Sequence, residues 1–295
     1  MDSRSFETGP RLTSFAGFDL SPEEARILIL PIPYDLTTSY EPGTRWGPSA
    51  VLQASYQLES YDEETDADLG DLSIATLPPI EPVVSGPAQM MAVVEEACYA
   101  LLGKNRRLVV LGGEHTLTVG VLRAYKRAGV NIHVLQLDAH ADLRETYQGS
   151  DLSHACVMAR VREIYPFIQV GIRSLSRGER ECLESSRVIW ARQIHEDLGA
   201  SLRRLDDILG DPVYITCDLD VLDPSLLPST GTPEPGGLDW RQITRILRHV
   251  GRTRTVIGLD FMEHSPRAGA HAADYVTARL MAKAFIYCWG IKSPP

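Results

Sequence analysis

The sequence predicts an α/β fold, in which a sheet of buried, mainly parallel strands is covered on both faces by helices. Short apolar runs rich in β-branched residues alternate with stretches whose apolar residues recur at helical spacing. No Pro/Ser-rich linker, repeat or low-complexity tract divides the 295 residues, and α/β folds of about 250 residues often form one domain. We therefore expect a single domain over residues 1–295, with the weakly periodic residues 1–20 as a loosely ordered N-terminal arm.

The expected elements alternate along the chain. In chain order they are a strand at 27–31, helices at 48–58 and 88–102, a strand at 108–111, a helix at 117–127, a strand at 132–137, a helix at 154–164, strands at 167–170 and 188–190, a helix at 194–209, a strand at 213–216, a helix at 240–250, a strand at 255–259 and a helix at 273–288. Sheets of this kind place ligands at the carboxyl ends of their strands. The acidic stretch 61–69 is expected to be a solvated loop.

Composition and charge exclude several classes of protein. The chain has 29 basic and 39 acidic residues and a net charge of −10, which argues against a nucleic-acid partner. It has no apolar run of about 18 to 20 residues, and the start lacks the features of a signal peptide, so we expect no membrane partner and a cytoplasmic location. The five cysteines are odd in number and widely separated, which predicts reduced, mostly buried thiols.

Two strand ends carry carboxylates and histidine at alternate positions. Asp138, His140 and Asp142 follow one strand, and Asp218 and Asp220 end another. Alternate residues of extended backbone share a face, so each set points one way, whereas Cys217 and Leu219 point the opposite way, into the core. Neighbouring carboxylates repel each other unless a cation neutralises them. A metal site is one interpretation; a cluster that caps helices and binds loop amides is the other.

A third strand runs into Gly112, Gly113, Glu114 and His115, where two glycines allow a sharp turn close to a site. No G-x-G-x-x-G fingerprint is present, so a dinucleotide site is disfavoured. The candidate ligands are then His115, Asp138, His140, Asp142, Asp218 and Asp220. Such a set can hold two divalent ions about 3.5 to 4 Å apart. Oxygen-rich sites with imidazole suit Mn²⁺, with zinc, nickel and iron left open, and the chemistry predicted is metal-assisted hydrolysis.

These segments resemble the ureohydrolase family of arginases and agmatinases, and are most similar to bacterial agmatinases. The resemblance spans about Pro31 to Pro266. It rests on Pro33-Tyr34-Asp35, Gly43-Thr-Arg-Trp-Gly-Pro48, Gly112-Gly-Glu-His115, Asp138-Ala-His-Ala-Asp142, Asp218-Leu-Asp-Val-Leu-Asp-Pro224, Gly231-Thr-Pro-Glu-Pro-Gly-Gly237 and Glu263. It implies an arginase-like three-layer αβα sandwich, two Mn²⁺ per chain, hydrolysis of a guanidino group to urea and an amine, and a homo-oligomer, often a trimer or hexamer.

The resemblance also assigns roles to residues. One ion would be held by His115, Asp138, Asp142 and Asp218, and the other by His140, Asp138, Asp218 and Asp220. A hydroxide bridging the ions would attack the guanidinium carbon, with Asp142 orienting it and receiving its proton. His154 would shuttle a proton, unless it is merely a histidine bonded at a helix start. Glu263 would bind the guanidinium through two parallel hydrogen bonds, and Thr232 would add a substrate contact.

The chain also departs from the family pattern. Glu114 stands where the family usually has Asp, and Thr216-Cys217 replaces the common Ser-Ile pair. Glu263 is followed by His264-Ser265 in place of a Val-Asn type pair; we expect His264 to be a solvated loop histidine, with a substrate-side contact as the alternative.

The substrate is predicted to be agmatine, hydrolysed to putrescine and urea. Arginine-specific members have Asn two positions after the equivalent of Asp142, and this chain has Arg144. Glu145 and Asp151 could meet a distal ammonium, which fits agmatine or aminopropylagmatine. Arg144 could instead meet a carboxylate, as in guanidinobutyrate or guanidinopropionate; arginine is the remaining alternative.

Two other classes of function stay open from the residues. Two-metal phosphoesterases also contain D-x-H and G-[ND]-H-[ED] motifs. In those enzymes the D-x-H motif comes first along the chain, whereas here the Gly-Gly-Glu-His segment precedes the D-x-H segment. A metal-stabilised binding protein without catalysis would keep the fold and the ligands. A deacetylase-type relative of the same fold would use one zinc and lack His115, so two metal ions per chain would disfavour that interpretation.

Overall fold

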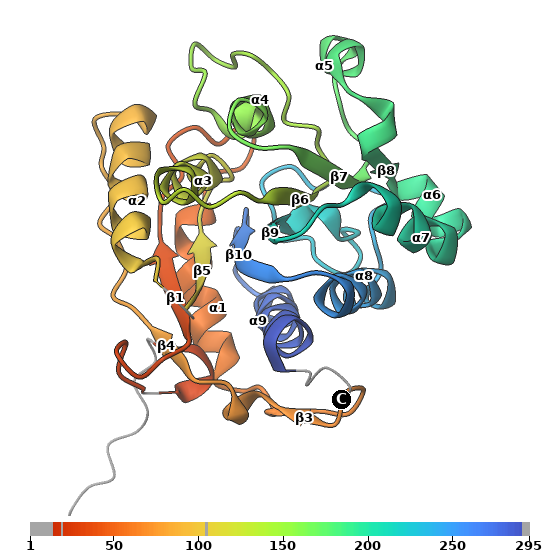
Figure 1. Cartoon of the computed structure of the whole chain (residues 1–295). Coiled ribbons are helices and arrows are strands. Elements are labelled where there is room, and N and C mark those ends of the chain that lie inside the picture. The colour runs from red at the N-terminus through yellow and green to blue at the C-terminus, as the bar shows by residue number, and fades with distance from the viewer. Residues whose placement is uncertain (1–13, 19, 104–105, 291–295) are drawn as a thin grey trace, which may run out of the picture.

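The computed structural model describes residues 14–18, 20–103 and 106–290. Its centre is an eight-stranded sheet with the order β4-β1-β5-β10-β9-β6-β7-β8, in which every pair of neighbours is parallel (Figure 1). The strands are β1 (Ile27–Ile32), β4 (Ile74–Thr76), β5 (Arg107–Gly112), β6 (His133–Leu137), β7 (Phe167–Ile172), β8 (Val188–Trp190), β9 (Val213–Asp218) and β10 (Val256–Met262), with a small hairpin of β2 (Tyr61–Asp62) and β3 (Ala67–Asp68). Each strand predicted from an apolar run is present.

Helices cover both faces of the sheet. They are α1 (Gly47–Ser55), α2 (Pro87–Leu101), α3 (Leu117–Arg127), α4 (Val157–Arg162), α5 (Arg177–Cys182), α6 (Ala191–Glu196), α7 (Leu198–Ile208), α8 (Trp240–Thr253) and α9 (His271–Phe285). Apolar side chains of α2, α3 and α4 pack in one core cluster, and those of α1, α7, α8 and α9 pack in another (Figure 1). The three-layer αβα sandwich is therefore confirmed.

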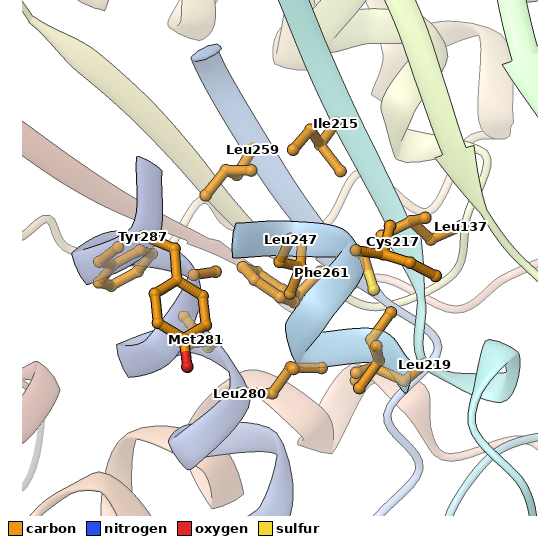
Figure 2. Packing of buried hydrophobic residues seen from close by; sticks show 14 of the residues in the cluster. Leu137, Ile215, Cys217, Leu219, Leu247, Leu259, Phe261, Leu280, Met281 and Tyr287 are labelled. Atoms are coloured by element: carbon orange, nitrogen blue, oxygen red, sulfur yellow. The ribbon is translucent and has the colours of Figure 1, made fainter. Parts of the chain in front are cut away.

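The strand β9 shows how alternation builds both the core and the site. Val213, Ile215 and Cys217 pack in the cluster with α8 and α9 (Figure 2), so the expected core position of Cys217 is confirmed. The side chains of the alternate residues, Tyr214 and Thr216, lie on the other face of the sheet. Tyr214 packs in the cluster on that face, and Thr216 is buried there. The five cysteines are all free thiols; three are buried, but Cys182 is exposed.

Some expectations about elements need correction. The helix predicted at 194–209 is two helices, because Asp197 adopts extended backbone and its side chain caps α7 at the Ala200 amide. The stretch 61–69 is not simply a solvated loop: it forms the β2–β3 hairpin, and the side chain of Asp62 is only 2% exposed beside the Lys283 ammonium at 2.7 Å. The short β4 and α5 have no strong apolar period and were not predicted.

Most of the predicted N-terminal arm, residues 1–13 and 19, lies outside the described residues. Within the described part, Phe15 is buried and its ring lies 5.4 Å from that of Phe285. None of the described helices is both long and apolar enough to cross a membrane.

Candidate active site

The candidate ligands lie at the carboxyl ends of central strands of the sheet. His115 follows β5, Glu263 follows β10, Asp218 ends β9 and Asp138 follows β6. In space these strands are neighbours in the order β5-β10-β9-β6, so segments far apart in sequence meet at one edge. This is where ligands bind in parallel α/β sheets.

Two groups of ligand atoms share a carboxylate. His115 Nδ1 lies 3.2 Å from Asp138 Oδ2 and 3.3 Å from both Asp142 Oδ2 and Asp218 Oδ2. This nitrogen is buried and has no hydrogen-bond partner among the described residues. It faces three carboxylates and is available as a metal ligand.

His140 defines the second group. Its Nδ1 lies 2.8 Å from Asp220 Oδ2 and 3.8 Å from Asp138 Oδ1. The ligand atoms of His115, Asp138 and Asp218 are close enough together to bind one cation, as are those of Asp138, His140 and Asp220. The structure thus brings all six predicted donors together, and Asp138 belongs to both groups.

The electrostatics of this cluster favour bound cations. Burial, and then the charges of Asp142 and Asp220, raise the pKa of Asp138 to about 7. Burial, with the charges of Asp220 and Asp138, holds the pKa of Asp218 well above its usual value. Burial lowers the pKa of His140, but the adjacent Asp220 carboxylate outweighs it and raises that pKa to about 11. Negative charge is therefore in excess here, and the donor set of carboxylates and imidazoles fits divalent metal ions.

Behind His115 lies a buried polar network that the sequence did not reveal. His115 Nε2 lies 2.8 Å from the Thr216 hydroxyl, which donates to Asp260 at 2.6 Å. The hydroxyls of Tyr214 and Thr118 donate to the same carboxylate. Because the Thr216 hydroxyl donates to Asp260, it accepts from His115 Nε2, which leaves Nδ1 as the nitrogen that faces the carboxylates and can bind a metal.

Asp142 and Glu263 both adopt left-handed backbone, with φ of 51° and 67°. Such a conformation costs about 1 to 3 kcal/mol for a residue with a side chain, and it is concentrated at functional sites. Glu263 is held there from both sides: its amide donates to the Gly113 carbonyl at 2.7 Å, and its Oε1 accepts from the His115 amide at 2.7 Å. Burial raises the pKa of the Glu263 carboxyl well above its usual value.

A cavity of about 310 Å³ opens above these residues. It is lined by the predicted site residues His115, His140, Asp142, His154, Asp218, Asp220, Thr232 and Glu263. Asp138 is fully buried beneath it. The lining also includes residues with no predicted role, among them Tyr147, Leu175, Ser176 and Glu179. The pattern Ser176-x-x-Glu179 is typical of a capping box, which forms here at the start of α5, but no local pattern indicates that these two residues line the cavity.

The profile of the arginase family matches residues 25–289 of the sequence. The chain belongs to the arginase family. It is 37% identical to the N(1)-aminopropylagmatine ureohydrolase of Synechocystis sp., covering 97% of this chain and 96% of that protein. It is 40% identical to the protein of the same name from Thermus thermophilus, covering 88% and 89%. Among solved structures, agmatine ureohydrolase of Thermoplasma volcanium superposes with a TM-score of 0.85 at 28% identity, covering 94% of each chain.

In this arginase-family hydrolase, the acidic residues expected at the substrate tail lie elsewhere. Glu145 binds Arg160 and Arg162 at 2.6 Å each, and neither Glu145 nor Asp151 lines the cavity. Arg144 does line it. Its guanidinium lies 5.0 Å above the Tyr147 ring, and its Nε lies 3.8 Å from Glu179 Oε2.

The expectation for His264 was wrong. Its side chain is 1% exposed rather than solvated, and Nε2 lies 2.7 Å from Asp274 Oδ1 at the start of α9. Asp274 provides the partner that a buried imidazole needs. The histidine therefore ties the turn after Glu263 to α9.

Proposed function

We propose that this arginase-family hydrolase cleaves the guanidino group of N(1)-aminopropylagmatine, releasing urea and the triamine that remains. The observation that carries the proposal is the likeness, at 37 and 40% identity over almost the whole length, to two proteins of that name. Agmatine, the substrate we expected first from the sequence, becomes the second candidate, because it has the same guanidinobutyl end and the superposed Thermoplasma volcanium structure carries its name.

We propose two Mn²⁺ ions as cofactor. His115, Asp138, Asp142 and Asp218 would hold one, and His140, Asp138, Asp218 and Asp220 the other; the short distances between these side chains support both sets. When bound, the ions would neutralise the carboxylates and acidify a water molecule.

The remaining residues of the cavity then have separate tasks. Glu263, which is buried and lines the cavity, would accept hydrogen bonds from the substrate guanidinium. Asp142 would orient the attacking water. Burial lowers the pKa of His154, so its imidazole is neutral near pH 7 and can take a proton and pass it to the leaving amine.

Charge supports a polycationic substrate. Glu179 and Glu263 line the cavity and belong to neither proposed ligand set, so they remain available to a cationic substrate when the ions are bound, and the whole chain has a net charge of −10. Such a field attracts a substrate that carries a guanidinium and further ammonium groups. A carboxylate tail, as in guanidinobutyrate, would gain less, because Arg144 lies beside Glu179.

The test is urea release by the Mn²⁺-loaded enzyme from N(1)-aminopropylagmatine, agmatine, guanidinobutyrate, guanidinopropionate and arginine in parallel. We expect kcat/KM to be highest for N(1)-aminopropylagmatine. A higher kcat/KM for any other compound would assign that compound as the substrate instead. Absence of urea from all five, with two metal ions bound, would refute guanidino hydrolysis and favour a binding protein.

A further inference from the structure

The segment that follows β1, residues 37–39, contacts the candidate proton shuttle directly. The Thr37 hydroxyl accepts a hydrogen bond from the His154 amide at 3.1 Å, and the Ser39 hydroxyl lies 3.2 Å from His154 Nε2. The Tyr147 and His154 rings are perpendicular, with an interplanar angle of 90° and centroids 5.7 Å apart. His154 is thus held through its backbone amide, a ring nitrogen and a ring–ring contact.

A buried carboxylate holds this segment in place. Glu114 Oε2 accepts from the Thr37 amide at 2.6 Å, and Oε1 accepts from the Thr37 hydroxyl at 2.9 Å. The backbone of Glu114 is anchored as well, because its amide donates to the Tyr34 carbonyl at 2.8 Å. Glu114 is fully buried and both of its carboxylate oxygens accept from Thr37. The Thr37 hydroxyl therefore contacts Glu114 and the His154 amide at the same time.

We propose that Glu114 and Thr37 are positioning residues that set the place of the His154 imidazole over the cavity. The inference rests on the proposed role of His154 as the group that protonates the leaving amine. A hydroxyl that donates to Glu114 presents its lone pair to the His154 amide, so the carboxylate fixes the direction of the contact. Neither residue touches the substrate; they act through His154.

The length of Glu114 matters to this arrangement. An Asp at this position, one methylene shorter, would have to reach the amide and the hydroxyl of Thr37 from farther away. Because a displacement of about 1 Å in a reacting group can lower turnover by about a hundredfold, the shorter carboxylate should impair proton transfer without removing a metal ligand. We therefore expect Glu114→Asp to lower kcat with the Mn²⁺ content unchanged; a normal kcat would overturn the positioning role of Glu114.

The experiment is a comparison of Thr37→Val in two backgrounds, the wild type and His154→Ala. Valine keeps the shape of threonine and removes only the hydroxyl. Urea release from N(1)-aminopropylagmatine and from agmatine gives kcat and KM, elemental analysis gives bound Mn²⁺, and thermal unfolding gives Tm. Thr37→Ser restores the hydroxyl. Thr65→Val is the matched control, because the Thr65 hydroxyl also donates to a carboxylate, Asp62 at 2.8 Å, in the β2–β3 hairpin.

We expect Thr37→Val to lower kcat about tenfold or more with little change in KM, Thr37→Ser to recover most of it, and Thr65→Val to leave it unchanged. In the His154→Ala background, Thr37→Val should cause no further loss. An equal loss in both backgrounds, or loss of Mn²⁺, would overturn the inference while leaving the role of His154 intact. Normal kcat in His154→Ala itself would instead refute that role, and the inference with it.

Discussion

The two ring nitrogens of His115 connect the buried network around Asp260 with the carboxylate cluster. Nε2 contacts Thr216, which is bound to the buried Asp260, and Nδ1 faces the carboxylates of Asp138, Asp142 and Asp218. The contact with Thr216 engages Nε2, so Nδ1 is the nitrogen available to a metal ion. Partners of this kind around a metal-binding histidine typically change metal affinity by about 10- to 100-fold when removed.

The first prediction concerns the carboxylates. Asp142→Asn or Asp218→Asn replaces a charged oxygen ligand by a neutral amide, which weakens its hold on a cation and its control of the attacking water. We expect kcat to fall by several orders of magnitude in the purified, Mn²⁺-loaded variants, measured by urea release. Near-normal activity of either variant would contradict the proposed ligand sets.

The second prediction separates substrate binding from metal binding. Glu263 contacts the His115 amide and lines the cavity, but it belongs to neither group of metal-ligand atoms. Glu263→Gln should therefore lower kcat/KM by about 100-fold or more, because a neutral amide accepts poorly from a guanidinium, while the Mn²⁺ content stays the same. Parallel loss of metal and activity would assign Glu263 to the metal centre instead.

At the scale of elements, one buried ion pair attaches the β2–β3 hairpin to α9. The Lys283 ammonium lies 2.7 Å from Asp62 Oδ2, with side chains 7% and 2% exposed. Burial raises the pKa of Asp62, but the hydrogen bonds from Lys283 and Thr65 outweigh it, so the pKa is lowered. The pair lies on a different part of the fold from the candidate ligands, which makes it a test of stability alone.

The third prediction follows from that pair. Lys283→Met leaves the Asp62 carboxylate buried without its partner, so we expect a loss of about 3 to 5 kcal/mol in the free energy of unfolding. The double variant Asp62→Asn with Lys283→Met removes the orphaned charge and should be more stable than Lys283→Met. Urea denaturation provides the measurement, and an unchanged midpoint for Lys283→Met would show that the pair contributes little.

The fold could be predicted largely from local pattern, and the site only in part. Runs such as Val213–Thr216 are apolar enough to identify buried strands, and ligand residues such as Asp138 and Asp218 directly follow or end such runs. Asp260 escaped notice because it lies inside an apolar strand, and only the neighbouring strands show that it binds Thr216 and Tyr214. Relations between strands far apart in sequence cannot be seen in local periodicity.

At the scale of the whole molecule, metal binding, pH and stability are coupled. Burial and the charges of Asp142 and Asp220 raise the pKa of Asp138 to about 7, against about 3.9 in an unfolded chain. Because the folded pKa is the higher one, ionising Asp138 destabilises the metal-free protein as pH rises from about 4 to about 7. A cation binds the ionised form and displaces the proton, so binding should strengthen over the upper part of that range.

The fourth prediction measures this coupling. The rise in Tm caused by saturating Mn²⁺ should be larger at pH 8 than at pH 6, with the metal-free protein kept in EDTA as the reference at each pH. An equal or larger Mn²⁺-induced rise at pH 6 would contradict the raised pKa as the cause.

The central strands β10 and β9 lie between β5 and β6 in the sheet, although they are the last two strands in the sequence. A growing polypeptide that has emerged only as far as Trp190, the end of β8, holds two separate parts of a sheet with exposed inner edges. Such edges invite pairing with other chains. During synthesis, this protein is therefore expected to need shielding until its final third has left the ribosome, and no nascent fragment lacking that third can turn over substrate.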